Sequence, residues 1–151
     1  MAKKLILNLE FKHPFQAIGI CSQQKDYRLC WLLNKHLEVE LRRMRDFHYT
    51  PQHQKAAVDF PVYRYKNERQ LIDFMLVSNK AEGQSLFSEP KTLDYLFLLR
   101  NSSDQFDVEE LLAKMRKTPY VQAAFFVGEK LGKQERDFFF DFELFLSQKK
   151  S

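Results

Sequence analysis

The sequence has few of the residues that common cofactor and metal motifs require. It contains four glycines, and their spacing matches neither a phosphate-binding loop nor a dinucleotide-binding fingerprint. Its two cysteines, Cys21 and Cys30, form no C-x-x-C motif, and no H-E-x-x-H motif is present. Because these are the patterns that hold zinc, ATP or NAD in their usual sites, we expect no metal and no cofactor.

Long apolar runs are also missing. No segment reaches the roughly 18 consecutive apolar residues that a membrane-spanning helix needs, so we expect no membrane span. The apolar stretch 5–7 is interrupted by Asn8 and Glu10, too early for a secretory signal peptide. These features predict a cytoplasmic protein, in which Cys21 and Cys30 stay reduced.

The composition is that of a globular chain of moderate size. Of 151 residues, 44% are hydrophobic and 29% are charged, which predicts a single domain over residues 1–151. Fifteen phenylalanines are present, and they indicate either a large aromatic core or an apolar patch for a partner or ligand. The net charge of +4 is lower than expected for a dedicated nucleic-acid binder.

A strand, a helix and a second strand are predicted between residues 93 and 127. Apolar residues run from 93 to 99 with one exception, as in a strand covered on both faces. Asp107 is placed to cap a helix whose apolar positions are Val108, Leu111, Leu112 and Met115. Thr118-Pro119 ends this helix, and residues 120–127 are apolar again. If both strands join one sheet, they are parallel and form a βαβ unit.

The rest of the chain predicts mainly strands. Residues 23–37, with Ser22 as the cap, have the spacing of an amphipathic helix, whereas residues 47–55 are polar and indicate a loop. Residues 38–43 fit a strand, with a continued helix as the alternative. Alternating apolar residues predict further strands at 4–11, 58–65, 70–78 and 138–146. We therefore expect an α+β fold: one mixed, mostly antiparallel sheet with two helices packed on it, including a C-terminal βαβ unit.

The segment 87–95 resembles Ile-Pro-Glu-x-x-x-Val-Asp-Tyr, the signature of the bacterial IPExxxVDY family. Glu89, Asp94 and Tyr95 match that signature, and its other three positions carry Phe, Ser and Leu here. The segment 25–31 is similar to a Lys-Asp-Tyr-Arg-Leu run near the start of these proteins. The resemblance covers most of the chain. It implies a small bacterial protein of unassigned activity and transfers no catalytic residue.

Asp94 is the polar residue that most requires an explanation, because it interrupts an apolar strand. A buried carboxylate needs a partner, and Arg28 is the expected one because a guanidinium suits a bidentate ion pair. One interpretation is a structural clamp between the first helix and the central strand. The other is a ligand pocket in which Tyr27, Glu89 and Tyr95 join Arg28 and Asp94.

A second candidate site is basic. Arg42, Arg43 and Arg45 cluster in the sequence, and they indicate either a solvated edge or a surface for an acidic partner. In the family that the chain resembles, genes often lie near those for ribonuclease III and acyl carrier protein, so RNA and that carrier are candidate partners.

We therefore expect a non-enzymatic binding or regulatory module. The βαβ unit resembles small-ligand regulatory domains of the ACT type, with residues 117–121 at the corresponding turn. The alternative is a basic adaptor that binds an acidic macromolecule. No catalytic residues are predicted, and the sequence is compatible with a homodimer.

Overall fold

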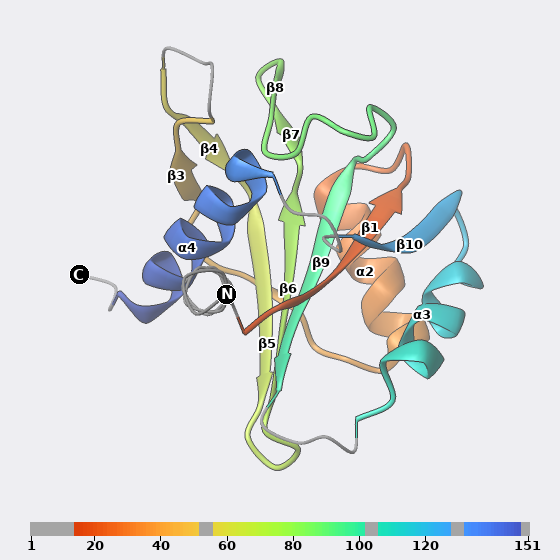
Figure 1. Ribbon diagram of the computed structural model, residues 1–151. Coiled ribbons are helices and arrows are strands. Elements are labelled where there is room, and N and C mark those ends of the chain that lie inside the picture. Colours follow the sequence, from red (N-terminus) through yellow and green to blue (C-terminus); the bar gives the residue numbers. More distant parts are fainter. Residues whose placement is uncertain (1–13, 52–55, 102–105, 128–131, 149–151) are drawn as a thin grey trace, which may run out of the picture.

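The computed structural model describes residues 14–51, 56–101, 106–127 and 132–148 (Figure 1). The fold is α+β, as the sequence predicted. In the described residues, six strands form one sheet in the order β10-β1-β9-β6-β5-β2, and every neighbouring pair is antiparallel. Three helices of the described part of the chain pack on this sheet, one more than expected.

The elements have the following bounds. The main sheet contains β1 (Gln16–Cys21), β2 (Arg42–Arg43), β5 (Val62–Asn67), β6 (Ile72–Ser78), β9 (Tyr95–Asn101) and β10 (Ala123–Val127). Two small ladders pair β3 (Phe47–Tyr49) with β4 (Val58–Phe60) and β7 (Lys80–Ala81) with β8 (Gln84–Ser85). The helices are α2 (Asp26–Leu37), α3 (Val108–Arg116) and α4 (Lys133–Ser147).

The predicted βαβ unit is confirmed as β9, α3 and β10. Both strands pair antiparallel with β1, so they run parallel to each other with β1 between them. The Asp107 side chain accepts a hydrogen bond of 3.0 Å from the Glu110 backbone N–H, as expected of the helix cap. The hairpin of β5 and β6 is also confirmed, and Pro61 separates β4 from β5.

Each face of the sheet carries its own hydrophobic core. Alternate residues of β6 serve the two cores, because successive strand side chains point to opposite faces. Phe74 and Leu76 pack with α2 and α3, whereas Met75 and Val77 pack beneath α4 and the β3–β4 ladder. Figure 1 shows α4 on the side of the sheet opposite to α2 and α3.

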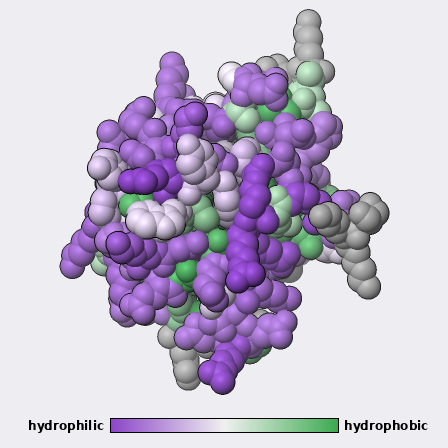
Figure 2. Space-filling view, turned by 180° about the vertical axis from the view of Figure 1, so that it is seen from behind, coloured by the Kyte–Doolittle hydropathy of each residue, from purple (hydrophilic) through white to green (hydrophobic). Residues whose placement is uncertain are grey.

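The phenylalanines mostly form core, which was the first of the two interpretations. Ten of them are buried in the described residues. Seven form a connected ring cluster, four of them on the inner face of α4: Phe15, Phe47, Phe87, Phe138, Phe139, Phe142 and Phe145. The face seen from behind is largely hydrophilic, with apolar residues visible only in small areas (Figure 2).

The predicted strand at 138–146 is wrong, because this segment lies within α4. Alternating phenylalanines suggested a period of two. The buried residues instead follow a helical spacing: Phe138, Phe139, Phe142, Phe145 and Leu146. Phe140 and Leu144, which the strand would have turned toward the same side as Phe138, are 64% and 49% exposed.

Other boundaries also differ from the predictions. The helix expected at 23–37 begins at Asp26, and its N-cap is Lys25 rather than Ser22. It ends where Glu38 adopts a left-handed φ of 57°, so only residues 42–43 of the expected strand 38–43 are a strand. Residues 47–49, predicted as loop, form β3. The strand predicted at 4–11 lies outside the described residues.

Candidate functional site

The structure ties Asp94 and Tyr95, at the start of β9, to the segment that leads into α2. Asp94 Oδ2 accepts a hydrogen bond of 2.8 Å from the Ser22 N–H, and its Oδ1 lies 3.2 Å from Lys80 Nζ. The Tyr95 hydroxyl donates to the Gln24 carbonyl over 2.6 Å. These contacts bind the central strand to the entry of the helix, which is a structural arrangement.

Three of the five residues expected in the clamp or the ligand pocket lie elsewhere. Arg28 is exposed, with its guanidinium 5.4 Å from the centroid of the Trp31 ring, so the predicted Arg28–Asp94 ion pair is wrong. Tyr27 is 65% exposed, and Glu89 is exposed in the loop before β9. The reason is the helical period, because α2 buries Leu29 and its apolar partners and thereby turns Arg28 outward.

The residue that holds the loop between β8 and β9 is Asn79, which lies between β6 and β7. Its side chain is fully buried. The amide nitrogen donates to the carbonyls of Phe87 (2.9 Å) and Leu93 (2.8 Å), and its oxygen accepts from the Phe87 N–H (2.7 Å). The sequence shows only that Asn79 lies in a polar segment between the apolar residues Val77 and Leu86. This position does not distinguish it from an ordinary loop asparagine.

A small cavity of about 280 Å³ lies beside the clamp and is lined by Ser22, Lys80, Asp94 and Tyr95 among others. Burial raises the pKa of Tyr95, and the nearby carboxylates of Asp26 and Asp94 raise it further. The hydroxyl therefore stays a protonated donor at neutral pH. The hydroxyl already donates its proton to the Gln24 carbonyl. The polar groups of this cavity therefore serve the clamp and leave few contacts for a ligand.

The three arginines of the predicted basic surface do not form one free surface. Arg43 makes an ion pair of 2.6 Å with Asp46. Arg45 donates to the carbonyls of Phe145 and Gln148 and lies 4.4 Å from the centroid of the Phe145 ring. It thus satisfies carbonyls at the C-terminal end of α4, where a cation is favoured. Arg42 is exposed on β2.

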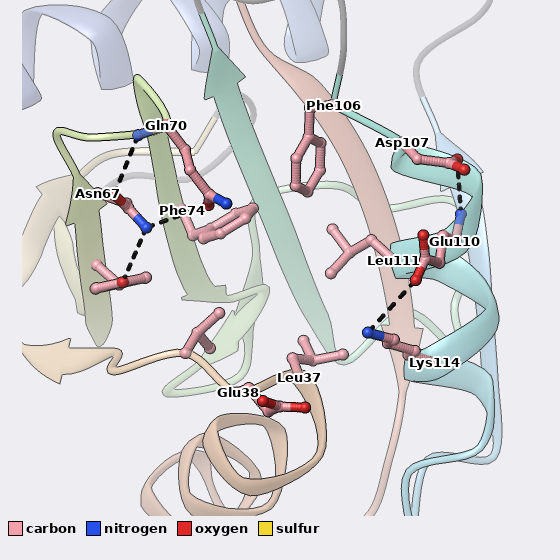
Figure 3. A pocket seen from close by; sticks show the side chains of 12 residues that line it. Leu37, Glu38, Asn67, Gln70, Phe74, Phe106, Asp107, Glu110, Leu111 and Lys114 are labelled. Atoms are coloured by element: carbon pink, nitrogen blue, oxygen red, sulfur yellow. Dashed lines mark hydrogen bonds and ion pairs between the residues drawn. The ribbon is translucent and has the colours of Figure 1, made fainter.

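A pocket of about 410 Å³ opens between the C-terminal end of α2, the β5–β6 hairpin and α3 (Figure 3). We call it the α2–α3 pocket. Its apolar lining consists of Leu37, Val39, Tyr65, Phe74, Phe106 and Leu111. Two ring contacts join the aromatic members: Phe74 lies 5.7 Å from Phe106 and 6.2 Å from Tyr65 between centroids. The volume is in the range of small-molecule sites.

Polar side chains surround this apolar lining. On the hairpin, Asn67 donates to the Tyr65 hydroxyl and to Gln70 Oε1, each over 3.2 Å. On the helices stand Glu38, Asp107, Glu110 and Lys114, and Lys114 lies 3.5 Å from Glu110. In Figure 3 the side chains of α3 and of the hairpin project toward one another across the opening. The lining thus combines six apolar or aromatic residues with six polar or charged ones, and polar groups that converge beside an apolar surface can orient a ligand.

A further cavity of about 540 Å³ lies at the other face of the hairpin, lined in part by Lys66, Leu71, Asp73 and Arg100. Asp73 is buried. Its Oδ2 accepts from Arg64 Nη2 over 2.6 Å and from Arg100 Nη2 over 2.9 Å. A buried carboxylate between two guanidinium groups is satisfied internally. This cluster therefore joins β5, β6 and β9 and is the weaker candidate for a ligand site.

Among the described residues, no group of three or more histidine, cysteine, aspartate or glutamate side chains could hold a metal ion. In the same part of the chain, no helix is both long and apolar enough to cross a membrane. No family model matches the sequence, and no curated protein matches it.

Proposed function

We propose that this protein is a non-enzymatic binding module that holds a small ligand in the α2–α3 pocket. The observation that carries the proposal is the aromatic and aliphatic lining enclosed by polar side chains from three separate elements. A pocket assembled from two helices and a hairpin also connects ligand binding to the positions of those elements. That connection is what a regulatory module requires.

We also propose membership of the IPExxxVDY family and a cytoplasmic location. Two signature residues, Asp94 and Tyr95, hold the entry of α2 to β9, which gives a physical reason for such a signature. Cys21 and Cys30 are buried and free, a state that suits a reducing compartment.

The alternative, a basic adaptor for RNA or acyl carrier protein, has less support. Arg43 and Arg45 are engaged within the chain by Asp46 and by the end of α4. A surface that binds phosphates needs several cations free to replace counterions, and in this cluster only Arg42 is exposed without a partner among the described residues.

A fragment screen followed by protein-observed NMR tests the proposed function. Fragments that bind are expected to shift the amide signals of Val39, Phe74 and Leu111, which line the pocket from the α2–β2 connection, β6 and α3. The blocking variant is Gln70→Trp, because the Gln70 side chain points toward Phe74 (Figure 3). Arg69→Trp is the matched control, since Arg69 is the adjacent exposed residue and lies outside the lining.

We expect Gln70→Trp to abolish these shifts and Arg69→Trp to preserve them. Failure of every fragment to shift the three amides would overturn the proposal. So would fragment binding that survives Gln70→Trp unchanged, because the ligand would then lie somewhere else.

A further inference from the structure

We infer that the ligand of the α2–α3 pocket is an organic cation, an amine attached to an apolar body. This inference rests on the proposed function and adds the chemical class of the ligand. Three features of the pocket carry it: an imbalance of charge in the lining, the orientation of a helix end and the aromatic floor.

The charged residues that line the pocket are mostly acidic. They comprise the carboxylates of Glu38, Asp107 and Glu110 and one ammonium group, that of Lys114. Lys114 pairs with Glu110 at 3.5 Å, which leaves two carboxylates without a balancing cation in the lining. The whole chain carries a net charge of +4, so the pocket has the sign opposite to that of the molecule.

Two helix ends of opposite partial charge reach the pocket. The C-terminal end of α2 reaches the pocket at Leu37 and Glu38, and its partial negative charge favours a cation. The N-terminus of α3 has the opposite sign, but the Asp107 carboxylate caps that end. A helix terminus is equivalent to roughly half a unit charge, so this carboxylate outweighs it.

The floor supplies the second half of the recognition. Phe74 and Phe106 lie 5.7 Å apart between ring centroids, and Tyr65 lies beside them. Aromatic faces attract cations electrostatically, by roughly 0.5–2 kcal/mol per contact according to exposure. An amine can therefore meet the partly exposed rings of Tyr65 and Phe106 and the carboxylates together, while its apolar body covers Val39.

Three probes of nearly equal size and different charge separate this class from the others. They are phenethylamine, 2-phenylethanol and phenylacetate, titrated into the full chain at neutral pH while the amides of Val39, Phe74 and Leu111 are followed. We expect phenethylamine to bind at least about tenfold more tightly than either other probe. Equal or tighter binding of the neutral or anionic probe overturns the cation inference and leaves the proposed pocket standing.

Charge variants give effects of opposite sign that a change in folding alone would not produce. Glu38→Gln and Glu110→Gln should each weaken phenethylamine several-fold, whereas Lys114→Gln should strengthen it. Glu109→Gln is the matched control, because Glu109 is exposed in the first turn of α3 and outside the lining. Equal affinities in all four variants, or no binding of any probe at the pocket amides, would overturn the inference. The fragment screen with Gln70→Trp then decides separately whether the pocket itself binds ligands.

Discussion

At the scale of single residues, Asn79 is the side chain on which the loop before β9 most depends. It makes three hydrogen bonds to the backbone at Phe87 and Leu93, all between 2.7 and 2.9 Å. Removing it leaves buried backbone groups without partners, which costs about 1–3 kcal/mol for each group. We expect Asn79→Ala to lower the free energy of unfolding by about 3 kcal/mol or more, measured by urea denaturation.

Thr92→Ala in the same loop is the control for this variant. Thr92 is exposed, so its truncation should change the free energy of unfolding by less than about 0.5 kcal/mol. A loss of similar size in both variants would show that the loop is sensitive to any substitution and that Asn79 has no special role.

Cys30 makes stability depend on pH at the alkaline end. Burial, the largest cause, raises the pKa of its thiol from 9.0 to about 11, against a lowering contribution from Asn34. The neutral thiol donates to the Leu41 carbonyl over 3.6 Å, a bond that the thiolate cannot make. The pKa of the thiol is higher in the folded chain than in the unfolded chain. The contribution of the neutral thiol to the free energy of unfolding is therefore fully present below pH 9 and is lost as the pH rises to about 11.

We expect the wild-type chain to lose up to about 3 kcal/mol more than Cys30→Ala between pH 8 and 11. Urea denaturation of both proteins at each pH measures the difference, and the other titrating groups cancel because both chains contain them. Parallel pH profiles would contradict a raised thiol pKa.

The sequence predicted part of this residue-scale chemistry. Asp94 interrupts an apolar strand, so its need for a partner was evident, and the structure supplies the Ser22 N–H and Lys80. The identity of the partner could not be predicted. It depends on where the β6–β7 connection places Lys80 and on which face α2 turns toward solvent.

At the scale of elements, α4 gives the sharpest test of the described fold. Phe139 is 1% exposed and Phe140 is 64% exposed, although a strand over 138–146 would have placed Phe140 on the same side as Phe138. Introducing a charge into the ring cluster without a partner is strongly destabilising. We expect Phe139→Asp to cost more than about 4 kcal/mol and Phe140→Asp less than about 1 kcal/mol.

Circular dichroism and urea denaturation of the two variants measure this difference. The reverse order of effects, with Phe140→Asp the more damaging, would support the strand. A helix over this segment also requires that Phe139→Leu, which keeps the apolar contact, recover much of the stability lost with Asp.

Elements were predictable where one period stood out. The spacing of α3 and its Asp107 cap predicted the helix correctly, and the apolar run of β9 predicted a strand covered on both faces. In α4, phenylalanine occupies both inward and outward positions, so apolar character alone did not separate a period of two from 3.6. Burial, which depends on the sheet beneath it, decides that question.

At the scale of the whole molecule, the insertion of β1 between β9 and β10 organises the fold and creates the candidate site. It sets α3 beside α2 on one face, and the β5–β6 hairpin completes the α2–α3 pocket. No local pattern contains this information, since the lining comes from residues between 37 and 114 that only the strand order brings together. The pocket was therefore not predictable from the sequence.

The two cores share their strands, and this predicts how the molecule unfolds. Phe74 and Leu76 pack beneath α2 and α3, while Met75 and Val77 of the same strand pack beneath α4. Losing either layer exposes β6 and β9 along one face and removes the packing that orders the other. We therefore expect both layers to unfold in one transition, as in a single cooperative domain.

Native-state hydrogen exchange in increasing urea measures this directly. The slowest amides of α2, around Leu29 and Leu33, and those of α4, around Phe142, should converge on one free energy of opening. The layer of α4 is the stricter test of a single transition, because its contacts are made by large aromatic side chains. Phe15 and Phe142, for example, lie 5.9 Å apart between ring centroids. If α4 opens several kcal/mol below α2, the ring cluster is a separate cooperative unit, and ligand binding between α2 and α3 would not be transmitted to it.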